Sequence, residues 1–504
     1  MRCRSRCHRV LVANGHFALD GTPGLGVEID EDNVQSVGRQ MTALTEEQNG
    51  RTVGMTVLPE WAQVEGAETV LDNLQRRAGV NAIATSPYVM APADAATGSR
   101  EPPADAGAGE VRLLDRLLWG RREIYCRTAP SYSPQQDLYR GLRYQPAVPD
   151  DLTQSQGAAV GRFIAAAKAR GMQVYLQVQA AIPPGYRVQF GSITADDQPL
   201  LPDGTPAQGR VDKNGSLASP HVRAYLKALL ADLGRAYPQI DGFRIDWPEY
   251  PPYTLDSAFL DFSDHAVRFA MQAGYDVDRI RRDTLVARKY LLGGLGEADL
   301  DPRRLKERLQ LAGLQDLFAL KSDIVEDFLK DIRSGLPQSF ALVPQAFPAP
   351  WNRVSGFDYA RAAPHSDGIG VKLYTMHWPM MLRFYGDSIM AANKGLDAGK
   401  LARLLVALCE TGGPPPTRLD DLRYPEPGEA HPVGHDRMAQ KIRNAQAAAG
   451  DRPVYAFAHG YGPVADVASR LRTAWEAGAH GMWINRYGYM SDEKLDAVGV
   501  ITRR

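Results

Sequence analysis

Short apolar runs recur along the chain from about residue 51 and alternate with longer segments whose apolar positions lie three or four residues apart. The short runs are typical of buried β-strands, and the longer segments are typical of amphipathic helices. Eight runs predict strands, at 53–58, 81–85, 173–178, 242–246, 340–344, 368–374, 454–458 and 481–485. Helices are predicted at 157–170, 220–237, 261–273, 303–312, 323–334, 396–410 and 464–477. This alternation, without a dinucleotide-binding fingerprint, predicts a (β/α)8 TIM barrel, with a doubly wound open sheet as the alternative.

The length of the chain predicts where the barrel is elaborated. A minimal barrel needs about 250 residues, whereas residues 51–504 are assigned here to the barrel. The surplus falls after the second, third and fourth strands, as insertions at about 89–153, 180–218 and 247–320. Loops that follow strands lie on the C-terminal face, where barrel enzymes hold their active sites. Residues 1–50 are a leader or extension that the pattern does not place.

Composition narrows the class of protein. Hydrophobic residues make up 44% and charged residues 23%, as in globular proteins. The net charge of -1 provides no basic excess for a polyanion, so no nucleic-acid partner is expected. No apolar run reaches the length of a membrane span, and four cysteines form no disulfide framework. A cytoplasmic location is expected, and a homo-oligomer stays open.

The segment 240–250, Ile-Asp-Gly-Phe-Arg-Ile-Asp-Trp-Pro-Glu-Tyr, is the most informative part of the sequence. It predicts a buried strand that ends in Asp246, with Glu249 following on the next turn. Because side chains alternate along a strand, Arg244 and Asp246 face the same side, and the cation favours the ionised carboxylate. An ionised Asp beside a second acid suits the cleavage of sugar acetals. A structural ion pair that caps the strand is the alternative.

Aromatic and polar residues gather where the predicted strands end. Flat aromatic rings stack on the apolar faces of sugars, and amides, imidazoles and single charges bind hydroxyls. Together with Arg244, the residues predicted to bind substrate are Trp61, Tyr88, Gln177, Gln179, Trp247, Tyr250, Gln345, Lys372, Tyr374, His377, Trp378, His459, Trp483, Asn485 and Arg486. A set of anchors packed over the top of the barrel is the alternative interpretation.

Two carboxylates are the usual machinery of glycoside hydrolysis. Asp246 is predicted to be the nucleophile or general base, and Glu249 the acid, with Glu60 beside Trp61 as the alternative acid. The ten histidines form no zinc motif, so a metal-independent reaction without a cofactor is expected. Other classes stay open: a sugar isomerase or lyase, an aldolase that uses Lys372 as a Schiff base, or a non-catalytic carbohydrate-binding barrel.

The motif Asp-Gly-Phe-Arg-Ile-Asp at 241–246 resembles the fourth-strand segment of the α-amylase superfamily, in which an Arg stands two residues before an Asp nucleophile. Residues 216–225 and 240–253 together are similar to a pattern in uncharacterised bacterial barrels grouped with the glycoside hydrolases. These resemblances imply a barrel fold, a carbohydrate substrate and hydrolysis of a glycosidic bond.

Overall fold

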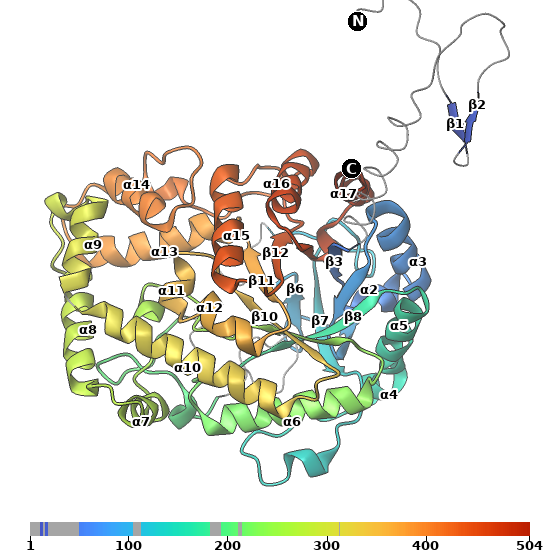
Figure 1. Ribbon diagram of the computed structural model, residues 1–504, viewed down its shortest axis with the longest axis horizontal. Coiled ribbons are helices and arrows are strands. Elements are labelled where there is room, and N and C mark those ends of the chain that lie inside the picture. The colour runs from blue at the N-terminus through green and yellow to red at the C-terminus, as the bar shows by residue number, and fades with distance from the viewer. Residues whose placement is uncertain are drawn as a thin grey trace, which may run out of the picture. The chain divides into compact units, whose positions relative to one another are not determined.

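Eight parallel strands close into one barrel in the computed structural model of this protein (Figure 1). The strands are hydrogen-bonded in chain order, and the last pairs with the first. They are β3 (Thr52–Thr56), β4 (Ala82–Thr85), β8 (Gln173–Gln179), β9 (Gly242–Asp246), β10 (Ala341–Ala346), β11 (Ile369–Leu373), β12 (Val454–His459) and β13 (Gly481–Asn485). All eight predicted strands are confirmed, with ends that shift by at most two residues, and the (β/α)8 fold is confirmed with them.

The structure describes residues 11–13, 16–18, 50–103, 112–181, 193–209, 214–311 and 313–503. The chain divides into two units, Met1–Gly50 and Arg51–Arg504. In the first unit, β1 (Leu11–Ala13) and β2 (His16–Ala18) form an antiparallel pair. The second unit holds the barrel.

Helices surround the barrel between consecutive strands (Figure 1). They are α2 (Pro59–Val64), α3 (Ala67–Asp72), α4 (Asp151–Gln156), α5 (Ala158–Ala169), α6 (Pro220–Ala236), α7 (Asp264–Gln272), α8 (Val277–Leu291), α9 (Pro302–Leu311), α10 (Leu314–Gly335), α11 (Trp351–Ser355), α12 (Tyr359–Ala362), α13 (His377–Ala392), α14 (Ala398–Cys409), α15 (His435–Ala449), α16 (Val464–Ala477) and α17 (Asp492–Thr502). The predicted helices correspond to α5, α6, α7, α9, α14 and α16, and 323–334 lies within the longer α10. Among the described residues, none of these helices is both long and apolar enough to cross a bilayer.

The start of α6 shows how local sequence positions the strand that follows it. Ser219 is the N-cap, and its hydroxyl accepts hydrogen bonds from the backbone N–H groups of His221 and Val222. Pro220 occupies the first helical turn, where it needs no hydrogen-bond partner. The helix ends before Tyr237, and the chain turns directly into β9.

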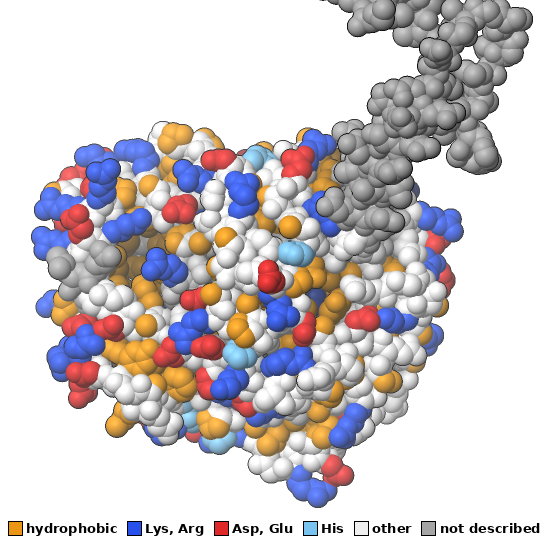
Figure 2. Space-filling model, in the orientation of Figure 1, with side chains coloured by type: hydrophobic (Ala, Val, Ile, Leu, Met, Phe, Trp, Pro, Cys, Tyr) orange, Lys and Arg blue, Asp and Glu red, His pale blue; other side chains and the backbone are white. Residues whose placement is uncertain are grey.

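The insertion after β4 carries a second, smaller sheet that the sequence pattern did not predict. Its three antiparallel strands are β5 (Tyr88–Pro92), β7 (Ile124–Pro130) and β6 (Ser99–Glu101), in that spatial order. Charged side chains of both signs are mixed over the face of the molecule drawn in Figure 2, and no continuous basic surface covers that face.

Two glycines make room for large side chains inside the barrel. A Cβ atom on Gly54 of β3 would lie 2.2 Å from the ring of Trp483. A Cβ atom on Gly370 of β11 would lie 2.2 Å from the side-chain oxygen of Gln345. Real Cβ atoms do not approach neighbours so closely, so the bulk of Trp483 and Gln345 requires glycine opposite.

We therefore expect Gly54→Ala to overpack the barrel and to lower the free energy of unfolding by about 2 kcal/mol. Chemical denaturation would measure the loss. Gly428→Ala is the matched control, because a Cβ atom there meets nothing within 4 Å. Equal stability of the two variants would contradict this account of the interior.

Candidate active site

The barrel interior is polar toward the carboxyl ends of the strands. Gln177 of β8 lies in register with Arg244 of β9, and Gln179 lies in register with Asp246, so these four side chains share a face. Arg244 reaches the ring of Trp483 on β13, which identifies that face as the interior. The predicted binding residues on the inward positions of strands are Gln177, Gln179, Arg244, Gln345, Lys372, His459, Trp483 and Asn485. Branched apolar residues usually fill these positions in barrels, so charges and amides here indicate a functional site.

Arg244 forms the floor of this polar region. Its guanidinium lies 3.8 Å from the ring centre of Trp483 and 4.4 Å from that of Phe457. Nη2 donates a hydrogen bond of 2.5 Å to Oε1 of Gln345. Burial lowers the pKa of Arg244 to about 9, so the side chain is still charged at neutral pH. A fixed positive charge therefore lies two residues below Asp246 on the same strand.

The two carboxylate oxygens of Asp246 have different surroundings. Its Oδ1 lies 2.7 Å from Nζ of Lys372 and accepts a 3.1 Å hydrogen bond from the backbone N–H of Trp247. The side chain is 12% exposed. Within the described part of the chain, Oδ2 has no hydrogen bond or ion pair. One hydrogen bond and one ion pair therefore hold the carboxylate at Oδ1.

Glu249 lies behind Lys372 and is fully buried. Its Oε1 is 3.7 Å from Nζ of Lys372 and accepts a 2.9 Å hydrogen bond from the N–H of Phe347, while Oε2 accepts one of 2.6 Å from the hydroxyl of Ser355. Burial raises the pKa of Glu249 to about 7, although Lys372 acts in the opposite direction. Lys372 therefore lies between two carboxyl groups in different environments: Asp246 is partly exposed and Glu249 is fully buried.

Glu60 occupies a separate position in the wall of the barrel. It lies in the first turn of α2 and is fully buried. Its Oε2 accepts a 3.2 Å hydrogen bond from the hydroxyl of Tyr88, at the start of the inserted sheet. No contact joins Glu60 to Asp246 among the residues that the structure describes. The two candidate acids thus differ in their relation to Asp246, since only Glu249 shares a cation with it.

The prediction that Trp61 and Trp378 are sugar platforms is wrong. Trp61 is 1% exposed and packs edge-on against Tyr487, and Trp378 is fully buried against Trp351. Rings enclosed in this way have no face for a sugar. A position near a strand end does not tell whether a side chain faces the mouth of the barrel or packs against its neighbours. Both of these rings pack against their neighbours.

Tyr250 and Tyr88 also serve the wall of the barrel. The hydroxyl of Tyr250 donates a 3.2 Å hydrogen bond to Asp261, and its ring is 3% exposed. Tyr88 is 3% exposed and bonds Glu60. By contrast, Tyr374 is partly exposed and lies beside the rings of His377 and His459. Of the predicted tyrosines, Tyr374 is the one whose side chain is partly exposed.

His377 joins the barrel to residues that sequence patterns did not reveal. Arg112, from the first insertion, donates from Nη2 to Nε2 of His377 across 2.9 Å, because a guanidinium can only donate. The hydroxyl of Tyr253 lies 3.0 Å from Nδ1 of the same ring. The roles of Nδ1 and Nε2 are thereby fixed for a neutral ring: Nε2 accepts from Arg112, and Nδ1 carries the hydrogen.

Two further residues that sequence patterns did not reveal are Tyr424 and Glu101. Arg112 also donates to the hydroxyl of Tyr424 across 3.1 Å, and the predicted Arg486 forms a buried ion pair with Glu101. Arg112, Tyr424 and Glu101 come from connections without strand or helix periodicity, or from the small inserted sheet. Only the folded chain brings them to Arg486 and His377.

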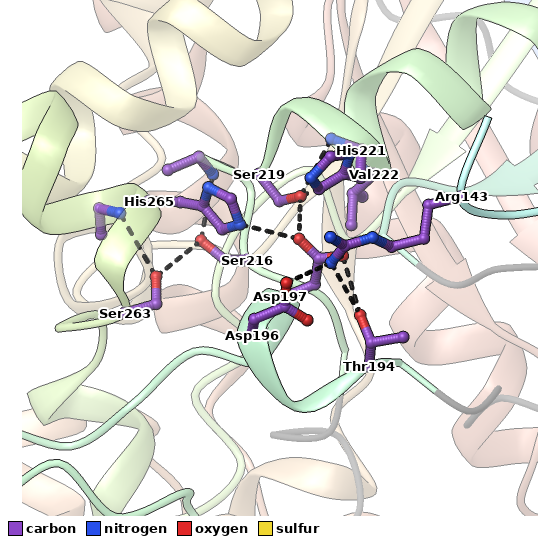
Figure 3. Close-up of polar contacts among 12 residues, drawn as sticks. Arg143, Thr194, Asp196, Asp197, Ser216, Ser219, His221, Val222, Ser263 and His265 are labelled. Carbon is purple, nitrogen blue, oxygen red and sulfur yellow. Dashed lines mark hydrogen bonds and ion pairs between the residues drawn. The ribbon is translucent and has the colours of Figure 1, made fainter. Parts of the chain in front are cut away.

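A second polar cluster, Asp197 with His221 and His265, could hold a metal ion by distance alone, since its ligand atoms lie within 4.8 Å of one another. Figure 3 shows the His265 ring pointing at the Asp197 carboxylate. Oδ1 of Asp197 accepts from Nε2 of His265 at 2.9 Å and from the hydroxyl of Ser219. Oδ2 accepts from Arg143 at 2.9 Å.

These contacts account for Asp197 without a cation. Arg268 approaches Nδ1 of His265 at 2.7 Å and can only donate, so Nε2 carries the hydrogen that Asp197 accepts. Although burial opposes ionisation, hydrogen bonds hold the pKa of Asp197 below its ordinary value. The donors are Ser219, Tyr144, Thr194 and Arg143. Two guanidinium groups beside the cluster oppose a further positive ion. We therefore assign the cluster a structural role, as the link between the 180–218 insertion, α6 and α7.

Comparisons with known proteins find no matching family model and no matching curated protein. Similar solved structures include three glycoside hydrolases. The β-galactosidase from Marinomonas ef1 is 12% identical with a TM-score of 0.46, over 90% of this chain and 59% of that chain. The chitinase from Chromobacterium violaceum is 9% identical with a TM-score of 0.38, over 90% and 99%. The catalytic domain of β-amylase from Paenibacillus polymyxa is 10% identical with a TM-score of 0.44, over 88% and 94%. At these identities and scores, we infer the function of this (β/α)8 barrel from the residues of its site alone.

Proposed function

We propose that this protein is a glycoside hydrolase that acts on an oligo- or polysaccharide, with Asp246 as nucleophile or general base. The observation that carries the proposal is the difference between the two oxygens of the Asp246 carboxylate. Lys372 and the amide of Trp247 hold Oδ1, while Oδ2 is left for chemistry at the carboxyl end of a barrel strand. That is the location at which barrel enzymes place catalytic groups.

Glu249 is the better candidate for the acid. A carboxyl group must hold a proton at the working pH to donate it to a leaving group, and burial raises the pKa of Glu249 to about 7. Two carboxyl groups whose environments separate their proton affinities are typical of an acid and base pair. The oxygens of Glu249 accept hydrogen bonds from Phe347 and Ser355. To donate its proton to a leaving group, Glu249 therefore requires the Ser355 hydroxyl to rotate or its own side chain to move. Glu60 stays the alternative acid.

The polar interior supports a substrate rich in hydroxyl groups. Several buried atoms on it lack a hydrogen-bond partner among the described residues: Thr56 Oγ1, Gln177 Oε1, Gln179 Oε1, and Nε and Nη1 of Arg244. A buried polar group left without a partner costs about 1–3 kcal/mol. Sugar hydroxyls both donate and accept, so they can pair with amide oxygens and guanidinium nitrogens alike. Tyr374, His377, His459, Asn485 and Arg486 complete the proposed binding set, and the reaction needs no metal or cofactor.

Asp246→Asn is expected to lower kcat/KM by about 10³-fold, because the amide removes the charge needed for nucleophilic or general-base action. A panel of aryl glycosides and short oligosaccharides would provide the assay, and circular dichroism would verify folding. Asp241→Asn is the matched control: Asp241 precedes the same strand and pairs with Lys168 at 2.8 Å, but at the opposite end. A fully active Asp246→Asn variant would remove Asp246 from the chemistry and favour a non-catalytic barrel.

Glu249→Gln separates an acid from a structural carboxyl group. We expect hydrolysis of alkyl glycosides and oligosaccharides to fall about 10²-fold, because their leaving groups need a proton. Dinitrophenyl glycosides need none and should keep most of their rate. Glu60→Gln, tested on both kinds of substrate, decides between the two acids, since the leaving-group dependence should appear in one variant only.

The pKa of Glu249 predicts the pH dependence. As an acid it is active when protonated, so kcat/KM should decline as the pH rises through about 7. Rates on a dinitrophenyl glycoside should not show this alkaline decline. A decline that persists unchanged in Glu249→Gln would assign the titration to another group.

A further inference from the structure

Trp247 has a backbone conformation that its residue type disfavours. Its φ angle is 53°, in the left-handed region, where a bulky aromatic residue is uncommon. Such residues cost of order 1–3 kcal/mol and persist where the surrounding structure holds them, often at functional sites. Trp247 directly follows Asp246 at the end of β9.

The backbone amide of Trp247 donates to the side chain of the preceding residue. The N–H lies 3.1 Å from Oδ1 of Asp246, which is the same oxygen that Lys372 contacts at 2.7 Å. The hydrogen bond and the ion pair both act on Oδ1, so together they restrict the rotation of the carboxylate and leave Oδ2 without either contact.

The indole ring holds this conformation in place. It is 7% exposed, meets Tyr253 edge-on at 6.4 Å, and lies 5.7 Å from Nζ of Lys372. A buried ring in contact with Tyr253 has little freedom to release the backbone. The same side chain therefore lies beside Lys372 and stabilises the turn in which the amide contacts Asp246.

We propose that Trp247 is a positioning residue, whose main-chain N–H, together with Lys372, orients Asp246 so that Oδ2 meets the substrate. This inference rests on the proposed function, in which Asp246 carries the chemistry. It assigns to the backbone of Trp247 a role that the identity of its side chain does not reveal.

The test removes the N–H donor of Trp247 and keeps its side chain. Incorporation of the α-hydroxy analogue of tryptophan at position 247 turns the amide into an ester, which keeps the indole and removes the N–H. Because a hydrogen bond to a charged group contributes more than one between neutral groups, we expect kcat of the 247 ester to fall about 10- to 100-fold. KM for an aryl glycoside should stay nearly unchanged. The same ester at Trp119 is the matched control, because that tryptophan also has a left-handed φ, of 47°. Unchanged kcat in the folded 247 ester would overturn the proposal.

A second variant separates the amide from the ring. Trp247→Gly keeps the N–H and adopts a positive φ without steric cost, so its kcat should fall less than that of the 247 ester. An equal or larger fall in Trp247→Gly would assign the effect to the ring and refute the role of the amide.

Asp246→Asn, assayed in parallel, distinguishes the two failures. If Asp246→Asn is fully active, the proposed function fails. If Asp246→Asn is impaired while the 247 ester matches wild type, only the positioning role of Trp247 fails.

Discussion

Closure of eight parallel strands forces every second side chain of each strand into one shared interior, and the site depends on this constraint. It brings Arg244 and Asp246 of β9 together with Lys372 of β11, although the last is more than a hundred residues away along the chain. Charges in such a place cost several kcal/mol per ion unless partners compensate. Here Lys372 has two carboxylates, and Arg244 has two aromatic faces and an amide oxygen. The glycines at 54 and 370 provide the space that these large partners need.

The alternation of apolar and polar positions was sufficient to predict the barrel, because strand periodicity is a local property. It also predicted that Arg244 and Asp246 share a face, and that a helix begins at residue 220, where α6 begins. Connections carry no such period. The small sheet at 88–130 and the contacts of Arg112 with His377 and Tyr424 arise from tertiary packing between distant segments. Trp61 and Trp378 show the complementary failure, since closeness to a strand end says nothing about which way a ring turns.

Trp247 illustrates a third kind of information that residue identity withholds. From its position, an indole beside two acids suggested a surface on which a sugar stacks. The folded chain shows a nearly buried ring, a left-handed φ angle and a backbone N–H that donates to Asp246. Sequence identifies the side chain, but its burial and its backbone conformation depend on packing in the folded chain, against Tyr253 of the same loop and near Lys372 of β11.

The contact that supports hydrolysis also bears on the aldolase alternative. A lysine that forms a Schiff base must attack a carbonyl as the neutral amine. Lys372 is 1% exposed, and its Nζ lies 2.7 Å from Asp246 and 3.7 Å from Glu249. Contacts with two carboxylates hold this nitrogen beside Asp246 and Glu249, with little of the side chain open to a carbonyl substrate. In the proposed reaction Lys372 therefore orients the carboxylate, and the reactive atom at the end of β9 is an oxygen of Asp246.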